Sequence, residues 1–542
     1  MKAWINRYWM LVVVVGVMLL YVPLSGRSEN QNLKVKNLEL FSEVLSILQK
    51  ESGEPAQKIS EYAIDGILST LDPHSSYFNE AEWRRMREDQ HGSYYGIGST
   101  IQEQDNGIVI ISPVKGGPAD RSGIRSGDII REINGETTEG ISSAQAQQKL
   151  RGEKNTAVSI KIQRIGVADL IPYTLLRAEI PNNSLYAVFM LNPTTGYILI
   201  RDFGETTNEE FRKAILNLKK QGMESLILDL RGNGGGLLNA AVGICRQLLD
   251  PNQSIVTIKG RYATDDIEEI TTEDSDTLDS FPIVCLINRG SASASEIVSG
   301  AIQDHDRGLI VGTTSWGKGL VQSVIPLGRS RGVAITTARY YTPSGRLIQR
   351  NYTDNLDDYL NPEQETDRAV QPTGTPYTTD LGRKVYGGGG INPDVFVTPA
   401  RMSPWIVDLR LRQNAFFRFA VLEKEKQMYR AGQPINEAVL TRFRRWLDET
   451  RVPYDGNQWN ANIEQIKEFL TLEFTNLFYD AQQGQKFLMQ SDPTVLKALE
   501  LMPEAQALFK RKQLHDKTKA PTKVTWLNTK PPSGLRTTRS FV

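Results

Sequence analysis

The stretch Pro282-Ile-Val-Cys-Leu-Ile-Asn-Arg-Gly-Ser-Ala-Ser-Ala-Ser-Glu-Ile297, continued to Gly312, decides the fold. Its first six residues form a short apolar run typical of a buried strand, and residues 294–302 have the composition of a helix. The apolar run 309–312 predicts the next strand. This order predicts a βαβ unit with a serine at the N-terminus of its helix, where free backbone N–H groups can hold a developing oxyanion.

Three serines compete for the role of nucleophile at this helix start, and spacing alone does not choose among Ser291, Ser293 and Ser295. A serine hydroxyl needs a base to take its proton, and a lysine can be that base if its pKa falls from about 10.4 to roughly 7–8. Lys318 lies between two glycines beside an apolar run, and residues 307–348 contain no acidic residue that would hold its charged form. The local sequence therefore predicts a buried, neutral lysine.

Further strands and helices alternate on the N-terminal side of this unit. Apolar runs at 226–230 and 255–258 predict strands, and the glycine-rich loop 231–236 separates the first of them from a helix at 237–249. An amphipathic helix is predicted over 207–221. Alternation of this kind predicts a largely parallel α/β core.

A second pattern lies nearer the N-terminus, at residues 91–178. Tyr95-Gly-Ile-Gly98 can present successive backbone N–H groups as a nest for a carboxylate. A strand at 107–112, a helix at 142–150 and a strand at 157–164 are predicted around the eighteen-residue run 118–135. Together these features resemble a PDZ domain, whose groove would capture a peptide by β-augmentation, although a PDZ fold could also serve only to pack or gate an enzyme.

From about Leu38 to Pro399 the chain resembles the C-terminal processing peptidases, also called tail-specific proteases, which are serine peptidases with a Ser–Lys dyad and an inserted PDZ domain. The resemblance implies that Ser293, the middle serine, is the nucleophile and that Lys318 is the base. It implies that Gln322 orients the lysine, which fits because positions i and i+4 of a strand share a face.

The same resemblance implies an oxyanion hole and a fold. The Ala294 N–H would be one donor, and a glycine of the loop 231–236, for which we choose Gly235, would be the other. The implied core is a crotonase- or Clp-like spiral of α/β units. No cofactor is needed for this chemistry.

Histidines and cysteines offer other chemistry, which the sequence disfavours. His74 could act as a base, but a turn held with Asp72 and Ser75 is the favoured interpretation. His305 follows Ser293 by twelve residues at the far end of the same helix and cannot be its base. No histidine pair has a metal-ligand spacing, so no metal is expected, and the two cysteines, Cys245 and Cys285, lie in apolar runs as expected for buried thiols.

The N-terminus predicts export. Lys2 and Arg7 precede the apolar run Trp9 to Leu24, which is either a signal peptide or a single membrane anchor of marginal length. Because the positive flank would stay cytoplasmic, the rest of the chain is expected in the periplasm, soluble or anchored to the inner membrane. The sequence does not decide between cleavage and retention.

The remaining segments complete the predicted organisation. Helical periodicity with aromatic stripes follows Pro404, which predicts four or five helices, and the polar stretch from Asn351 to Tyr386 resembles an insertion or mobile loop. The predicted domains are a signal or anchor (1–27), an N-terminal helical segment (28–90), a PDZ domain (91–178), a Ser–Lys peptidase core (179–400), a helical domain (401–515) and a disordered tail (516–542).

The leading hypothesis is an exported endopeptidase that recognises protein C-termini and cleaves nearby through an acyl-enzyme. The alternative is a PDZ scaffold or chaperone whose hydrolase fold is inert, which the presence of Ser293, Lys318 and Gln322 disfavours. Sixty-three basic and sixty-three acidic residues balance, so composition gives no argument for nucleic acid as a partner. Expected partners are proteins or peptides with free C-termini, and helices at both ends could mediate a homodimer.

Overall fold

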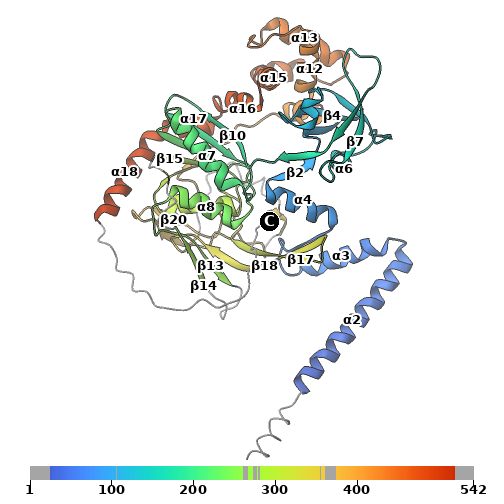
Figure 1. Cartoon of the computed structure of the whole chain (residues 1–542). Coiled ribbons are helices and arrows are strands. Elements are labelled where there is room, and N and C mark those ends of the chain that lie inside the picture. The colour runs from blue at the N-terminus through green and yellow to red at the C-terminus, as the bar shows by residue number, and fades with distance from the viewer. Residues whose placement is uncertain are drawn as a thin grey trace, which may run out of the picture.

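The chain is described here from a computed structural model, which describes residues 25–104, 107–260, 267–272, 278, 281–353, 356–360 and 374–518. Figure 1 shows a central α/β body, a smaller β-rich body beside it, a helical arm at the N-terminus and further helices at the C-terminus. The predicted α/β core and helical flanks are confirmed, and the smaller β-rich body is formed by the stretch predicted as a PDZ domain.

The central sheet carries the predicted βαβ unit. Its strands run in the order β10 (Leu185–Met190), β11 (Thr195–Ile200), β12 (Ser225–Asp229), β15 (Ile283–Ile287), β16 (Gly308–Gly312) and β21 (Val395–Phe396). All neighbours from β11 to β21 pair in parallel, and β10 pairs antiparallel with β11. These short apolar strands are buried on both faces, as parallel strands usually are.

Helices cover both faces of this sheet. Side chains of α7 (Thr207–Lys220), α8 (Leu238–Leu248) and α9 (Ala294–Asp304) form one core with Leu226, Leu228 and Cys285. The alternate residues Ile227, Val284 and Leu286 point to the other face, where α17 (Pro493–Glu500) and α18 (Met502–Thr518) pack. Cys245 and Cys285 are buried free thiols, as predicted.

A second, antiparallel sheet lies beside the first. It contains β1 (Ser76–Phe78), β18 (Arg331–Tyr341), β13 (Ser254–Gly260) and β14 (Ile267–Thr271) in this order, with β17 (Leu320–Leu327) also paired to β18. The strand predicted at 255–258 is therefore present, but it belongs to this sheet and not to the parallel core. An apolar run predicts a buried strand without saying which neighbour it pairs with.

The PDZ body is a sheet of β3 (Ser99–Gln104), β4 (Gly107–Pro113), β5 (Ile129–Ile133), β7 (Ala157–Gln163) and β8 (Ile171–Leu176), with β6 (Glu136–Thr137) paired to β5. α5 (Pro118–Arg121) and α6 (Ser143–Leu150) complete it. β3 is an edge strand of the sheet. A ribbon of β2 (Ser93–Gly96) and β9 (Ala178–Pro181) leads from this body to the core.

Three helices precede the PDZ body: α2 (Ser25–Ser52), α3 (Ala56–Ser69) and α4 (Glu80–His91). In Figure 1, α2 projects away from the body and α4 lies between the PDZ body and the core. Within the described residues, none of the helices has the length and apolarity needed to cross a membrane. The predicted signal or anchor, Trp9 to Leu24, lies outside the described residues.

The C-terminal region is helical, but the expectation of four or five helices is too low. The segments are α11 (Pro404–Val407), the π-helical turn η2 (Asp408–Arg412), α12 (Ala415–Glu425), α13 (Glu437–Glu449), α14 (Gly456–Ala461), α15 (Ile463–Phe478), α16 (Ala481–Met489), α17 and α18. Its aromatic stripes form a buried core, as predicted. α18 continues to Thr518, beyond the predicted domain end, and residues 519–542 of the predicted tail lie outside the described residues.

The stretch 351–386, predicted as an insertion or mobile loop, contains a helix and a hairpin within its described residues. Its described residues include α10 (Leu356–Leu360) and a hairpin of β19 (Pro376–Thr378) and β20 (Lys384–Tyr386). Tyr359 of α10 is buried although two aspartates precede it in the sequence. Residues 354–355 and 361–373 lie outside the described part.

Candidate active site

Ser293 stands in the turn between β15 and α9, as the N-cap residue of the helix. Its backbone has φ 54° and ψ −113°, a region that residues other than glycine rarely adopt and that costs about 1–3 kcal/mol. Ser293 is only 1% exposed, and its hydroxyl has no hydrogen-bond partner among the described residues. The fold thus holds a strained serine with a buried, unpartnered hydroxyl at a helix N-terminus.

The two neighbouring serines are used differently. The Ser291 hydroxyl donates to the Leu230 carbonyl at 2.8 Å, and the Ser295 hydroxyl donates to the Asn233 carbonyl at 2.8 Å. Both bonds fasten the turn to the segment that follows β12. Of the three serines that the sequence left in competition, only Ser293 has a hydroxyl without a hydrogen-bond partner in the described part of the chain.

Lys318 lies two residues before β17 and is buried, 7% exposed, and its Nζ donates to Gln322 Oε1 at 2.8 Å. Burial lowers the pKa of the Lys318 ammonium to about 8. The negative charges of Glu296 and Asp72 act in the opposite direction. The sequence of residues 307–348 therefore did not show which charges surround Lys318, because both carboxylates come from other segments of the chain.

The contact between Lys318 and Gln322 does not arise in the way that was expected. β17 begins at Leu320, so Lys318 precedes the strand, and the register of β17 shifts between Val321 and Gln322. A simple alternation of faces therefore does not relate the two residues. The two side chains meet where the loop before the strand joins this irregular part of β17.

Glu296 joins the serine and the lysine, and the sequence analysis missed it. Its carboxylate is fully buried, and Oε2 accepts the backbone N–H of Ser293 at 2.8 Å and of Lys318 at 2.9 Å. Oε1 accepts the Gly317 N–H at 2.7 Å and the Ser315 hydroxyl. Burial raises the pKa of Glu296, whereas the four donors stabilise its ionised form. The signal for this role was an acidic residue three positions after the N-cap.

Tyr340 makes a second link between the same two residues. Its hydroxyl, fully buried on β18, lies 3.1 Å from the Ser293 carbonyl oxygen and 2.6 Å from the Lys318 carbonyl oxygen. Glu296 thus accepts from the two backbone N–H groups, and the single Tyr340 O–H lies within hydrogen-bond distance of both carbonyls, closer to that of Lys318. The backbones of Ser293 and Lys318 are fixed against each other by two buried side chains.

The predicted oxyanion donors lie at the serine, but one of them is engaged. Gly235 has φ +111°, and a Cβ at this position would lie 2.9 Å from the Ser293 Cβ and 3.2 Å from the Ala294 nitrogen. The Gly235 N–H donates to Asn233 Oδ1 at 2.9 Å. The Ala294 N–H has no acceptor among the described residues. The glycine loop therefore packs directly against Ser293, and Ala294 offers an available backbone donor.

The turn around His74 closes the other side of the lysine. Asp72 accepts the backbone N–H groups of His74 and Ser75 at 2.9 and 2.8 Å, which confirms the predicted turn. The His74 carbonyl oxygen accepts a hydrogen bond from Gln322 Nε2. The His74 ring nitrogen Nε2 lies 2.6 Å from the Tyr359 hydroxyl. Burial, followed by the nearby Lys318 charge, lowers the pKa of His74 to about 4.

His305 is far from this site. It follows the last residue of α9, at the end opposite to Ser293, and binds Asp380 and the Ser254 carbonyl. The described residues hold no group of histidine, cysteine and acidic side chains that could bind a metal.

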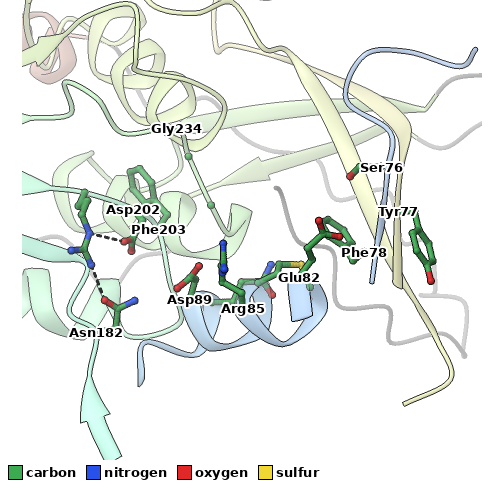
Figure 2. Close-up of a pocket in the computed structure, with 15 residues that line it drawn as sticks. Ser76, Tyr77, Phe78, Glu82, Arg85, Asp89, Asn182, Asp202, Phe203 and Gly234 are labelled. Carbon is green, nitrogen blue, oxygen red and sulfur yellow. Dashed lines mark hydrogen bonds and ion pairs between the residues drawn. The ribbon is translucent and has the colours of Figure 1, made fainter. Parts of the chain in front are cut away.

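A cavity of about 830 Å³ opens on the other side of the glycine loop. It is bounded by Gly234–Gly236, by β1 and by α4. Figure 2 shows Arg85 and Asp89 rising from α4 into this cavity, with Asp202 opposite. An adjoining cavity of about 400 Å³ shares Arg85 and reaches Tyr95 and the helix α6 of the PDZ body. The two cavities follow α4 from the PDZ body to the loop beside Ser293.

The Tyr95-Gly-Ile-Gly98 segment is half strand and half loop. Tyr95 and Gly96 end β2, the Ile97 side chain is buried in the PDZ core, and Gly98 has φ +72°. The backbone N–H groups of Ile97 and Gly98 meet no acceptor among the described residues. They lie just before the edge strand β3, where a carboxylate nest was predicted.

The chain is similar to known proteins over these parts. Residues 194–356 match peptidase family S41, and residues 85–163 match the PDZ domain. The carboxy-terminal-processing protease of Bartonella bacilliformis is 34% identical over 62% of this chain and 78% of that protein. The carboxy-terminal processing protease CtpB of Bacillus subtilis is 33% identical over 61% of this chain and 68% of that protein.

Among solved structures, the photosystem II D1 C-terminal processing protease aligns at 29% identity with a TM-score of 0.34. The alignment covers 65% of this chain and 85% of that one. The stretch matched to family S41 includes Ser293, Lys318 and Gln322.

Proposed function

Since the chain belongs to the carboxy-terminal processing proteases of peptidase family S41, which are serine peptidases, we propose that it is an exported endopeptidase that binds the C-terminus of a protein substrate in its PDZ groove and cleaves nearby. The observation that carries the catalytic part is the Ser293–Glu296–Lys318 arrangement. A strained serine with an unpartnered hydroxyl shares one buried carboxylate oxygen with a lysine whose pKa is lowered to about 8.

In the proposed reaction, neutral Lys318 accepts the proton of the Ser293 hydroxyl as Oγ attacks the carbonyl carbon of the scissile bond. Lys318 then gives this proton to the leaving amine, and the acyl-enzyme forms. Water attacks the ester with Lys318 again as the base, which releases a new C-terminal carboxylate and restores the serine. Gln322 orients the ammonium through its Oε1.

The oxyanion of each tetrahedral intermediate would lie between the Ala294 N–H and the glycine loop. Because Gly235 donates to Asn233, use of its N–H would require the Asn233 side chain to release it on substrate binding. Loss of one such donor costs about 3–4 kcal/mol of activation free energy in enzymes that depend on it.

Substrate would reach this site along α4. The two adjoining cavities, which share Arg85, run from the PDZ helix α6 to the glycine loop. A C-terminal segment held by the Ile97 and Gly98 amides and paired with the edge strand β3 would lie at the outer end of this path. We therefore propose proteins with extended C-terminal tails as substrates.

Active-site labelling tests the proposal. A fluorophosphonate should label the wild-type chain at Ser293, and labelling and β-casein cleavage should both be lost in Ser293→Ala. Lys318→Ala should bind the same peptides but cleave none. Cleavage that survives both substitutions would refute the dyad, and an unlabelled, inactive wild-type chain would favour the inert scaffold.

Export is proposed from the charged and apolar N-terminus alone. Residues 1–30 fused to an alkaline phosphatase without its own signal should yield an active, exported phosphatase. Substitution of Val13 and Leu19 by aspartate should abolish this, because charge interrupts the apolar run. An inactive wild-type fusion would contradict export.

A further inference from the structure

The C-terminal helices contact the glycine loop beside the candidate active site. Arg231, the first residue of this loop, donates from Nη1 to both carboxylate oxygens of Asp492 at 3.0 and 2.9 Å. Asp492 lies immediately before α17 and also caps it by accepting the Val495 N–H at 2.9 Å. The guanidinium also binds Asp229 at the end of β12, so one arginine joins the strand, the loop and the C-terminal helices.

The glycine loop that begins at Arg231 is hydrogen-bonded to the turn that holds Ser293. Asn233, two residues later and fully buried, accepts the Ala292 N–H at 3.0 Å and the Ser295 hydroxyl through its carbonyl. The Gly232 N–H donates to Asn288 Oδ1 at 2.8 Å. A shift of the loop at Arg231 would therefore move residues on both sides of Ser293.

The same C-terminal region also binds the PDZ body. Phe417 and Val421 of α12 form a buried cluster with Val109 of β4. Asn414 Nδ2 donates to Gln102 Oε1 at 3.0 Å, and Gln102 lies on the edge strand β3. The approach is close, because a Cβ at Gly127 would lie 2.3 Å from the Val421 Cγ1.

A continuous packed core joins these two ends. α12 and α15 share buried aromatic side chains, and Lys424 Nζ donates to the Leu477 carbonyl at 2.6 Å. α15 and α16 pack so closely that a Cβ at Gly484 would lie 1.9 Å from Asn476 Oδ1. Figure 1 shows the orange and red helices running from the PDZ body to the central sheet. Interiors of this density transmit displacement because they resist compression.

We propose that residues 404–500 form a strut that fixes the position of the glycine loop relative to the PDZ strand β3. Asp492 is the positioning residue at the core end, and Val421 is the positioning residue at the PDZ end. The strut aligns a polypeptide held on β3 with the Ser293 hydroxyl and keeps the glycine loop in register with the serine turn. This role rests on the proposed peptidase function and assigns a task to a region that lies beyond both family matches.

Asp492→Ser tests the core end, because serine keeps the helix cap but is too short to bind Arg231. The expected result is a fall of roughly 10- to 100-fold in kcat for an internally quenched peptide with a free carboxylate, with KM unchanged within about twofold. Asp480→Ser is the matched control, since Asp480 caps α16 by accepting the Gln483 N–H at 2.8 Å and does not contact the loop. Equal kcat values in the two variants would overturn the role of Asp492.

Gly127→Ala tests the PDZ end. Gly127 has φ +89°, and Gly123 has φ +78° with no atom within 4 Å of the point where a Cβ would lie, so Gly123→Ala introduces similar backbone strain without the collision. Gly127→Ala should lower kcat about tenfold or more, and Gly123→Ala should not. Val421→Ala added to Gly127→Ala should restore most of the loss, because the new methyl group at position 127 then takes the place of the removed Val421 methyl and the contact between the two segments persists. Loss in both glycine variants, or no rescue, would overturn the strut.

Fluorophosphonate labelling of Ser293 separates this inference from the proposed function. If the wild-type chain is labelled and cleaves the peptide while Asp492→Ser and Gly127→Ala match it, only the strut fails. If the wild-type chain itself is neither labelled nor active, the proposed function fails. Binding of the fluorescent free-carboxylate peptide in a Ser293→Ala background should be unchanged by either strut substitution, and weakened binding would contradict a role in alignment alone.

Discussion

The Glu296 carboxylate accepts the backbone N–H of Lys318 at 2.9 Å across 22 residues of sequence. The same oxygen accepts the Ser293 N–H, so one buried charge fixes the positions of both residues. It also raises the pKa of the Lys318 ammonium against the larger opposing effect of burial. Glu296 therefore influences both the geometry and the protonation of the proposed dyad.

Glu296→Gln should reduce kcat/KM and shift its pH profile to lower pH. The glutamine amide N–H group would face N–H and O–H groups that now donate to the Glu296 carboxylate. Each buried donor that is left without an acceptor lowers stability by about 1–3 kcal/mol. Removal of the negative charge also lowers the pKa of Lys318 below about 8. Glu423→Gln, which removes another buried carboxylate, serves as the control because it should not move the midpoint of the profile. An unshifted midpoint in Glu296→Gln would contradict the electrostatic role.

The three serines should respond differently to alanine. Ser293→Ala should abolish cleavage with little change in the free energy of unfolding, because its buried hydroxyl has no hydrogen-bond partner within the residues that the structure describes. Ser291→Ala and Ser295→Ala should each lower that free energy by about 1–2 kcal/mol, because each removes a bond to a buried carbonyl, and should retain labelling. Chemical denaturation and fluorophosphonate labelling measure the two effects. If labelling were lost only in Ser291→Ala or only in Ser295→Ala, that serine and not Ser293 would be the nucleophile.

The pH dependence should follow the ionisation of Lys318. In the proposed mechanism the unprotonated amine is the base, so kcat/KM should rise with pH and level off above about 8. Because folding lowers this pKa, burial of the charged Lys318 lowers the free energy of unfolding at neutral pH. This loss of stability should disappear as the pH rises from about 8, the pKa in the folded state, to about 10.4, the pKa in the unfolded state.

Gln322→Glu should move the same profile to higher pH. A carboxylate at the position that now contacts Nζ at 2.8 Å favours the ammonium and raises its pKa. Gln349→Glu is a suitable control, because Gln349 binds the neighbouring Gly319 N–H rather than the amine. A larger alkaline shift in the control than in Gln322→Glu would argue that the Gln322 contact does not govern the ionisation of the Lys318 amine.

Gly235→Ala should be more damaging than Gly232→Ala. Both glycines have positive φ values, +111° and +72°, so both alanines strain the backbone. Only at Gly235 would the new Cβ meet the Ser293 Cβ and the Ala292 carbonyl, at 2.9 and 3.0 Å. We expect Gly235→Ala to lose at least tenfold more kcat/KM than Gly232→Ala, by steady-state assay of the quenched peptide. Equal losses of kcat/KM would show that backbone strain in the loop, rather than a collision with Ser293, causes the effect of both substitutions.

Local pattern was sufficient for several elements. The alternation of apolar runs and helical segments predicted the βαβ unit around Ser293, because such periodicity records which face of an element is buried. The turn at Asp72 was predictable for a similar reason, since its hydrogen bonds reach only two and three residues along the chain. The aromatic stripes after Pro404 likewise predicted a helical core.

The sequence by itself determined which residue types are present and which short segments they form, including a serine at a helix start and a lysine between glycines. Only the tertiary structure decided which of three serines keeps an unengaged hydroxyl, which carboxylates surround Lys318, and which sheet receives β13. It also decided that Asp492 binds Arg231, 261 residues away. These outcomes depend on contacts between distant segments, whose hydrogen bonds and burial exist only after the chain has folded.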